Sequence, residues 1–401
     1  MKEPTPPLES RHQTSGCNSL FNGNGLTFTE YIALNRDMIA TVRSRASSTD
    51  FKKIVDGNAP FQLPPAAGFA AGHKKPYRRG ILLTHGLTDS PYFMRALGHF
   101  FQAQGFRVLA VLLPGHGTQP GDLLEVTWQE WEKTVSYGTD QLANEVDEIY
   151  LGGYSAGGVL TILQSLHDPR VCGLFLFSPA LKISSRAAWA SWHKIYSWLY
   201  PAAKWINIKP DTDIYKYESS PKNIAAQLHA LIKKLHAQLA QQALNIPIFT
   251  VASQDDATAD SRATVEFMAQ TTHPASTLVF YTTDTRTPPL GILPEKLELI
   301  NSHLPEQKIL SSAHTAVVLP PDDAHYGGTG DYSNCIHYYP DEMEKYHACS
   351  HHHASIAGLP DIAQGEINEK NLNLGILRRL MVNPHFAALE ISMKKFIARL
   401  P

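Results

Sequence analysis

A serine between two glycines follows a short apolar run near the middle of the chain. The residues are Gly153-Tyr154-Ser155-Ala156-Gly157, and apolar residues precede them from Ile149 on. This spacing is typical of a sharp strand-to-helix turn that exposes a nucleophilic serine, because only small residues two positions away let strand and helix approach each other. The helix expected over 159–166 would point its first amides at the same place, where a negative oxygen could bind. The pattern predicts Ser155 as a nucleophile if catalytic partners exist.

A serine hydroxyl is a poor nucleophile unless a histidine takes its proton and a carboxylate holds that histidine. The apolar strand expected over 247–253 leads into Gln254-Asp255-Asp256. Counting along the usual spacing after such a strand selects Asp256 as the acid, with Asp255 as the alternative acid. A strand expected over 308–312 would end in a small-residue turn that presents His314 as the base. The competing interpretations are helix capping for the aspartates and a structural role for His314.

Two backbone amides are needed to stabilise the oxyanion of a tetrahedral intermediate. We assign them to Ala156, which follows the nucleophile, and to Leu87, which follows His85-Gly86 at the end of an earlier strand. His85 is expected to hold its loop by hydrogen bonds rather than to act as a base. His116, in Gly115-His116-Gly117, is expected to do the same.

The elements that must position these residues alternate between strands and helices. Apolar runs expected to form strands lie at 81–84, 106–113, 148–153, 173–178, 248–252 and 277–281. Several are apolar on both faces, which predicts an α/β fold with a mostly parallel sheet covered by helices on both faces. Thr127 and Glu130 form the pattern of a capping box that opens a helix. Ligands in such folds lie at the carboxyl ends of the strands, where Ser155 is expected.

Five motifs carry a resemblance to a known family. They are His85-Gly86-Leu87-Thr88-Asp89-Ser90-Pro91, Pro114-Gly115-His116-Gly117, Gly153-Tyr154-Ser155-Ala156-Gly157-Gly158, Asp255-Asp256-Ala257-Thr258 and Ser312-Ala313-His314. In this order they resemble the bacterial carboxylesterase and monoacylglycerol-lipase branch of the α/β-hydrolase superfamily, which is also similar to enzymes labelled serine aminopeptidases. The resemblance implies the α/β-hydrolase fold and hydrolysis of carboxylic esters, often with apolar acyl chains. It also implies an acyl-enzyme mechanism that uses no metal or other cofactor.

The segments around this core predict the domain organisation. Residues 1–75 are expected to be a partly loose N-terminal extension, and residues 76–401 the α/β-hydrolase domain. Within it, residues 181–245 are rich in aromatic and apolar residues and predict an inserted helical cap over the serine. Residues 320–382 are expected to be a loop-rich insertion before a C-terminal helix that begins after Asn383-Pro384.

The insertion contains two of the four cysteines, Cys335 and Cys349, together with several histidines. A disulfide between these cysteines and two free thiols are both open interpretations. A zinc site drawn from these cysteines and from His325, His337, His347 and 351–353 is a weaker alternative, because the spacing matches no standard zinc pattern.

Composition limits the classes of partner and compartment. Lys+Arg 35 against Asp+Glu 37 gives a formal net charge of −2, so no basic field favours nucleic acid. Neither an apolar run of membrane-spanning length nor a signal peptide is visible, which favours the cytoplasm. A disulfide between Cys335 and Cys349 would instead favour an extracytoplasmic compartment.

The sequence therefore predicts a serine hydrolase that cleaves carboxylic esters of a small-molecule, lipid-like or acylglycerol-type substrate. An acyltransferase or thioesterase that uses the same three residues is one alternative. The other is a non-catalytic scaffold of the same fold that binds a hydrophobic ligand. The oligomeric state is left open.

Overall fold

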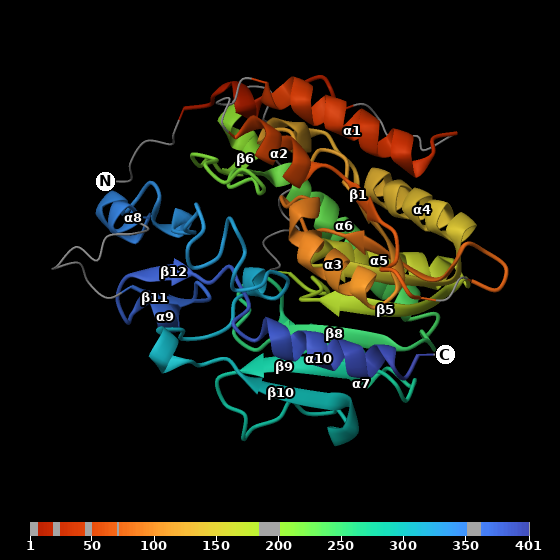
Figure 1. Ribbon diagram of the computed structural model, residues 1–401. Helices are drawn as coiled ribbons and strands as arrows, with labels where there is room; N and C mark the ends of the chain where they lie inside the picture. The colour runs from red at the N-terminus through yellow and green to blue at the C-terminus, as the bar shows by residue number, and fades with distance from the viewer. Residues whose placement is uncertain are drawn as a thin grey trace. The chain divides into compact units, whose positions relative to one another are not determined.

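Two units make up the part of the chain that this computed structural model describes (Figure 1). The described residues are 7–18, 25–44, 50–69, 72–183, 201–350 and 362–400. One unit contains the described residues up to 175 together with 183–246, and we call it the serine unit because it contains Ser155. The other contains 176–182 and the described residues from 247 on, and we call it the histidine unit because it contains His314.

The sheet of the serine unit has the strand order β1-β3-β2-β4-β5. Its strands are β1 (Phe61–Leu63), β2 (Tyr77–Thr84), β3 (Phe106–Val111), β4 (Val146–Tyr154) and β5 (Val171–Phe177, with 171–175 in this unit). β2 pairs in parallel with β3 and β4, while β1 pairs antiparallel with β3. Thr84 of β2 lies opposite Gly153 of β4. The segments that follow these two strands, which carry Leu87 and Ser155, therefore leave the sheet at the same edge.

Burial explains why these segments form strands. Ile81, Leu82 and Leu83 are adjacent in β2, so their side chains alternate between the two faces, and all three are fully buried. Every residue of β3 is also buried. Strands that are apolar on both faces are typical of parallel sheets that are covered on both sides.

The helices of the serine unit that are longer than one turn are α1 (Phe28–Arg43), α2 (Phe51–Asn58), α3 (Arg95–Ala103), α4 (Trp128–Glu145), α5 (Ala156–His167) and α6 (Lys222–Leu239). The helix expected over 159–166 is α5, which begins three residues earlier, at Ala156. The predicted capping box of α4 is confirmed, because the Thr127 side chain accepts from the Glu130 amide and Glu130 bonds back to the Thr127 amide. Trp131 of α4 is fully buried and donates its indole N–H to the Pro114 carbonyl at 3.1 Å.

Part of the predicted cap, with Trp189, Trp192 and Trp198, falls on residues 184–200, outside the described residues. The remainder consists of η5 (Pro201–Lys204), an antiparallel pair of β6 (Trp205–Asn207) with β7 (Ser220–Pro221), and α6. α6 follows Ser220-Pro221 directly. It buries the apolar residues that recur at helical spacing, namely Ile224, Leu228, Leu231, Ile232 and Leu235.

The N-terminal segment 7–18 contacts the body of the serine unit. It contains η1 (Ser10–His12), and Arg11 forms an ion pair with Asp211 at 3.0 Å. Ser15 hydrogen bonds through its amide and hydroxyl to Asp122, in η3 (Pro120–Leu124), at 2.6 and 2.9 Å. This part of the extension is therefore attached by specific polar contacts.

The histidine unit is built on three parallel strands in the order β8-β9-β10. They are β8 (Ile248–Ser253), β9 (Thr277–Thr282) and β10 (Leu297–Asn301), with α7 (Ser261–Ala269) after β8. Figure 1 shows the predicted C-terminal helix, α10 (Phe386–Ile397), lying along these strands. The rings of Phe249 in β8 and Phe396 in α10 are 5.5 Å apart, so the apolar side of α10 packs on this sheet.

The strand predicted over residues 308–312 is wrong. Ile309 makes only isolated bridges, to Leu304 and to Gln364, and Lys308 has a left-handed backbone with φ of 56°. β10 already pairs with β9 in the position that such a strand would take. His314 instead begins a short 3₁₀ turn, η8 (His314–Ala316).

The insertion 320–382 contains two short helices and one pair of short strands within the described residues. They are α8 (Met343–Ser350), α9 (Glu369–Leu372), β11 (Ala363–Gly365) and β12 (Leu377–Arg379). β11 and β12 pair in parallel, and Cys335 and Cys349 are joined in a disulfide that packs in a buried cluster with Tyr338. Short 3₁₀ turns elsewhere are η2 (Pro91–Met94), η6 (Pro294–Lys296), η7 (Pro305–Gln307) and η9 (Ile336–Tyr338).

Replacing Cys335 and Cys349 by serine is expected to lower the free energy of unfolding by about 2–4 kcal/mol, because the bridge restricts the unfolded chain. The two cysteines are 14 positions apart in the sequence. Urea unfolding without reductant measures the difference. Cys172→Ser, which removes a free cysteine, is the control and should change little. Equal unfolding free energies for the double variant and the parent would contradict this prediction.

Candidate active site

Ser155 lies at a strained turn between β4 and α5. Its φ of 54° and ψ of −116° place a non-glycine residue in a sparsely populated region, which is typical of functional turns held by their surroundings. The glycines on either side make the turn sterically possible. A Cβ on Gly153 would lie 2.4 Å from the Gly157 carbonyl oxygen, and one on Gly157 would lie 2.2 Å from the Thr84 carbonyl oxygen. The turn therefore has the geometry that the sequence pattern predicts.

The loop that follows β2 lies directly against this serine. A Cβ on Gly86 would be 3.1 Å from the Cβ of Ser155. The next residue, Leu87, is one of the two predicted oxyanion donors. The other, Ala156, is the first residue of α5, where backbone amides have no partner within the helix. Both predicted donors thus belong to segments that meet at Ser155.

His85 and His116 hold this loop, as the sequence predicts. The Nε2 atom of His85 accepts from the Leu113 amide at 3.0 Å, and Nε2 of His116 accepts from the Thr88 amide at 3.1 Å. Both rings are fully buried. Burial lowers the pKa of His116 to about 4 and lowers the pKa of His85 well below its usual range. Both imidazoles are therefore neutral hydrogen-bonding groups.

A contact that the sequence pattern does not reveal fixes the same loop from the segment between β6 and β7. Lys216 forms an ion pair with the buried carboxylate of Asp89 and donates to the Thr88 hydroxyl at 3.0 Å. The Tyr217 amide donates to the Thr88 carbonyl at 2.9 Å. Thr88 has a φ of 65°, so these bonds hold a residue in the left-handed region. No local motif marks Lys216, because its partner is 127 positions away.

In the histidine unit, His314 and Asp256 are hydrogen bonded. The distance from His314 Nδ1 to Asp256 Oδ2 is 2.6 Å, and both side chains are buried. The other carboxylate oxygen of Asp256 accepts from the amides of Thr258 and Ala259, each at 2.8 Å. The carboxylate is therefore fixed before it orients the imidazole. A separate aspartate, Asp260, caps α7.

Asp255 occupies a different environment. One of its carboxylate oxygens is buried without a hydrogen-bond partner, and burial raises the pKa of Asp255. The negative charge of Glu366 also raises this pKa, whereas Lys370 lowers it. The contact of the His314 ring with Asp256 supports Asp256 rather than Asp255 as the acid.

These observations assemble two halves of the predicted site. The serine unit brings the loop of Leu87 to Ser155 and Ala156, and the histidine unit brings Asp256 to His314. The meeting of Ser155 with His314 across the two units stays a prediction.

The zinc site considered as an alternative would need the thiolates of Cys335 and Cys349. These two cysteines are bonded to each other and cannot supply them. Within the described ranges, no group of three or more histidine, cysteine, aspartate or glutamate side chains could hold a metal ion. Residues 351–353 of that proposal lie outside the described residues.

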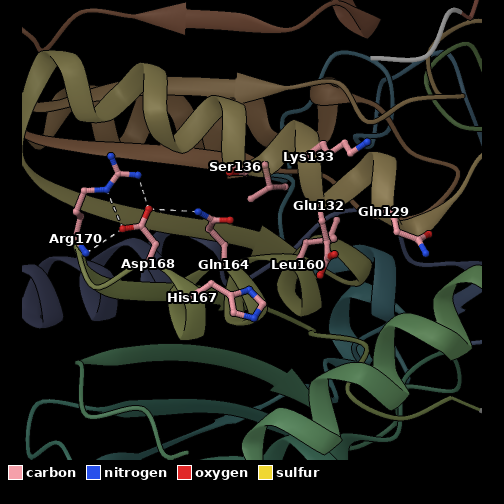
Figure 2. A pocket seen from close by; sticks show the side chains of 10 residues that line it. Gln129, Glu132, Lys133, Ser136, Leu160, Gln164, His167, Asp168 and Arg170 are labelled. Atoms are coloured by element: carbon pink, nitrogen blue, oxygen red, sulfur yellow. Dashed lines mark hydrogen bonds and ion pairs between the residues drawn. The ribbon is translucent and has the colours of Figure 1, made fainter. Parts of the chain in front are cut away.

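A pocket of about 550 Å³ lies elsewhere in the serine unit, between residues of α4 and α5 (Figure 2). Charged side chains line much of it, among them Glu132, Lys133, Asp168 and Arg170. Figure 2 shows Arg170 and Gln164 both bonded to Asp168. None of the candidate catalytic residues lines this pocket.

Parallel strands, a strained serine turn at the end of a strand and a histidine–aspartate pair are features of the α/β-hydrolase class. The chain belongs to the family described as "Serine aminopeptidase, S33", whose sequence profile matches residues 75–283, just over half of the chain. The predicted fold and superfamily are thereby confirmed.

Individual proteins are similar to this chain over a comparable region. A thermostable monoacylglycerol lipase of Bacillus sp. (strain H-257) is 29% identical over 189 residues, which are 47% of this chain and 75% of that protein. A carboxylesterase of Bacillus subtilis (strain 168) is 24% identical over 182 residues, 44% of this chain and 72% of that protein. The crystal structure of a Paleococcus ferrophilus monoacylglycerol lipase has 18% identity and a TM-score of 0.43, covering 56% of this chain and 88% of its own.

Gly157→Ala is expected to destabilise the protein by about 2 kcal/mol or more, because the new methyl group would overlap the Thr84 carbonyl and force the backbone to move. Gly328→Ala is the matched control, since nothing lies within 4 Å of a Cβ at that position. Thermal unfolding of both variants checks the prediction. Equal stability of the two would mean that the close approach at Ser155 is not required.

Stability is expected to fall as the pH decreases from about 6.5 towards about 4. The unfolded chain protonates His116 below about pH 6.5, whereas the folded protein keeps its imidazole neutral until about pH 4. The unfolded state binds more protons in this window, so acid favours unfolding. Urea unfolding at pH 7 and pH 5 should show a smaller loss for His116→Gln than for the parent. Identical losses would show that His116 does not contribute.

Proposed function

We propose that the protein is a serine hydrolase that cleaves carboxylic esters through an acyl-enzyme intermediate. The 2.6 Å hydrogen bond between Asp256 and His314 carries this proposal, together with the strained turn at Ser155. A carboxylate only accepts, so the bonded Nδ1 carries the proton and Nε2 is the basic atom of the ring. That arrangement is the one a general base for a serine hydroxyl requires.

In the proposed first step, Ser155 Oγ attacks the ester carbonyl while Nε2 of His314 takes the hydroxyl proton. Asp256 stabilises the imidazolium that forms, and the amides of Leu87 and Ala156 bind the oxyanion. Collapse of the tetrahedral intermediate breaks the bond to the alkoxide, which receives the proton from His314 and departs as an alcohol. The acyl group is then bonded to Ser155.

Water completes the proposed cycle. His314 takes a proton from a water molecule, whose oxygen attacks the acyl carbonyl and forms a second tetrahedral intermediate. Its collapse releases the carboxylic acid and returns the proton to Ser155 Oγ. An acyltransferase or thioesterase would use the same residues with another acceptor or donor.

The proposed substrates are small esters with an apolar acyl chain, of the acylglycerol type. The similarity to proteins named monoacylglycerol lipase and carboxylesterase supports this class. The family name refers to aminopeptidases, so an amide is the competing substrate and an amine the competing leaving group. A paired comparison of an acyl ester with the matching aminoacyl amide distinguishes the two.

An extracytoplasmic place of action is part of the proposal. The Cys335–Cys349 disulfide supports it, because such bonds persist in oxidising compartments. Among the helices of the described segments, none combines the length and the apolar character needed to cross a membrane.

Hydrolysis of p-nitrophenyl esters with increasing acyl length tests the reaction and its residues. Ser155→Ala and Asp256→Asn are expected to lower kcat by about 10³-fold or more, since each removes one member of a unit that acts together. Asp255→Asn is the matched control and should retain kcat within a few-fold.

Two results would contradict the proposal in different ways. Greater damage from Asp255→Asn than from Asp256→Asn would show that the acid is assigned incorrectly. A folded parent that neither hydrolyses the esters nor reacts with a fluorophosphonate at Ser155 would favour a ligand-binding scaffold.

A further inference from the structure

Glu366 is a fully buried carboxylate that lies immediately after β11, in the insertion 320–382. Its Oε2 atom accepts from the backbone amide of His314 at 2.9 Å and from the amide of Ala257 at 3.4 Å. Ala257 is the residue after Asp256. One side chain therefore binds both the segment that carries the candidate base and the segment that carries the candidate acid.

The other oxygen of Glu366 fixes the carboxylate in place. Oε1 accepts from the amide of Ile367 at 2.8 Å and from the guanidinium of Arg379 at 2.9 Å. Arg379 also donates to the hydroxyl of Thr258 at 2.8 Å. Thr258 is two residues after Asp256, so Arg379 adds a second connection to the acid segment.

All four of these partners of Glu366 are hydrogen-bond donors. A carboxylate can accept all of them, because it has acceptor sites on both oxygens and no donor. Glutamine has the same shape, but its NH₂ group would face either the amides of His314 and Ala257 or the amide of Ile367 and the guanidinium of Arg379. The site is therefore built for an ionised glutamate, whose charge the ion pair with Arg379 compensates.

The backbone around Glu366 is held as firmly as its side chain. Its amide donates to the Ser311 hydroxyl at 3.2 Å, and its carbonyl accepts from the Asn371 side chain at 2.9 Å. Asn371 also donates to the Ser311 hydroxyl at 3.0 Å. Ser311 precedes His314 by three residues. The insertion is therefore hydrogen bonded to the segment before His314 as well as to the His314 amide.

We propose that Glu366 is a positioning residue that keeps Asp256 and His314 at hydrogen-bonding distance, with Arg379 as its counter-ion. This gives the insertion a role in the reaction, because Glu366 directly follows β11 and Arg379 is the last residue of β12. The inference rests on the proposed function in that Asp256 and His314 are its acid and base. Glu366 touches neither the substrate nor the reacting atoms in this scheme.

Glu366→Gln tests the proposal by removing the charge and adding one unfavourable donor contact. We expect kcat for a p-nitrophenyl ester to fall by about 10–100-fold with KM changed less than about twofold, since loss of alignment affects the reaction more than binding. We also expect the downfield proton resonance of the His314 Nδ1–H···Asp256 bond to shift or disappear. Glu366→Asp, which keeps the charge but shortens the side chain, is the second variant.

Glu145→Gln is the matched control. Glu145 forms an ion pair with the buried Arg107 at 2.6 Å, and neither residue is part of the candidate site. This variant should retain the kcat and the downfield resonance of the parent. If only Glu366→Gln lowers kcat, the effect comes from the Glu366–Arg379 pair. It does not then come from losing a partly buried ion pair in general.

The outcomes are distinguishable from those for the proposed function. A folded Glu366→Gln or Glu366→Asp variant with the kcat and resonance of the parent would overturn the positioning role. Failure of both variants to fold would also overturn it, because the carboxylate would then serve the fold. If Ser155→Ala retained activity, the proposed function would fail, and the resonance alone would decide whether Glu366 positions the pair.

Discussion

The hydrogen bond between Asp256 and His314 is the interaction on which the rest of the site depends. At 2.6 Å and out of solvent, it assigns the proton to Nδ1 and leaves Nε2 as the basic atom of the proposed general base. A buried carboxylate is costly unless it is well bonded, and Asp256 receives two further amide bonds from its own turn. The surrounding structure therefore prepares the pair in advance, which is what proton transfer during a reaction requires.

The turn at Ser155 depends on a steric constraint rather than on charge. β4 and α5 approach so closely that Gly153 and Gly157 have no space for a side chain, and Ser155 takes a strained backbone conformation between them. Neutral buried histidines and the Lys216–Asp89 ion pair hold the adjacent loop. Rigid placement of the proposed oxyanion amides follows from these contacts, since preorganised donors are effective only when they do not have to move.

Local sequence patterns predicted much of the fold and of the candidate site. The features that they missed depend on contacts between residues far apart in the sequence. The turn at Ser155 and the caps of the helices depend on residues a few positions apart, so the sequence reveals them. Counting residues after the strand at 247–253 selects Asp256 over Asp255. Only the structure shows which of the two carboxylates is hydrogen bonded to His314. The strand predicted before His314 is wrong because β10 pairs with β9 instead. Glu366 belongs to no motif, because its contacts with His314 span 52 positions.

We propose that Ser155 and His314, which belong to different units, act in a single reaction centre. A crystal structure of the protein after reaction with a phosphonate ester tests this most directly. The account predicts phosphorus bonded to Ser155 Oγ, the phosphonyl oxygen within hydrogen-bonding distance of the Leu87 and Ala156 amides, and His314 Nε2 next to Ser155 Oγ. An adduct in which the His314 ring points away from Ser155, or a phosphonate bonded to another residue, would contradict it.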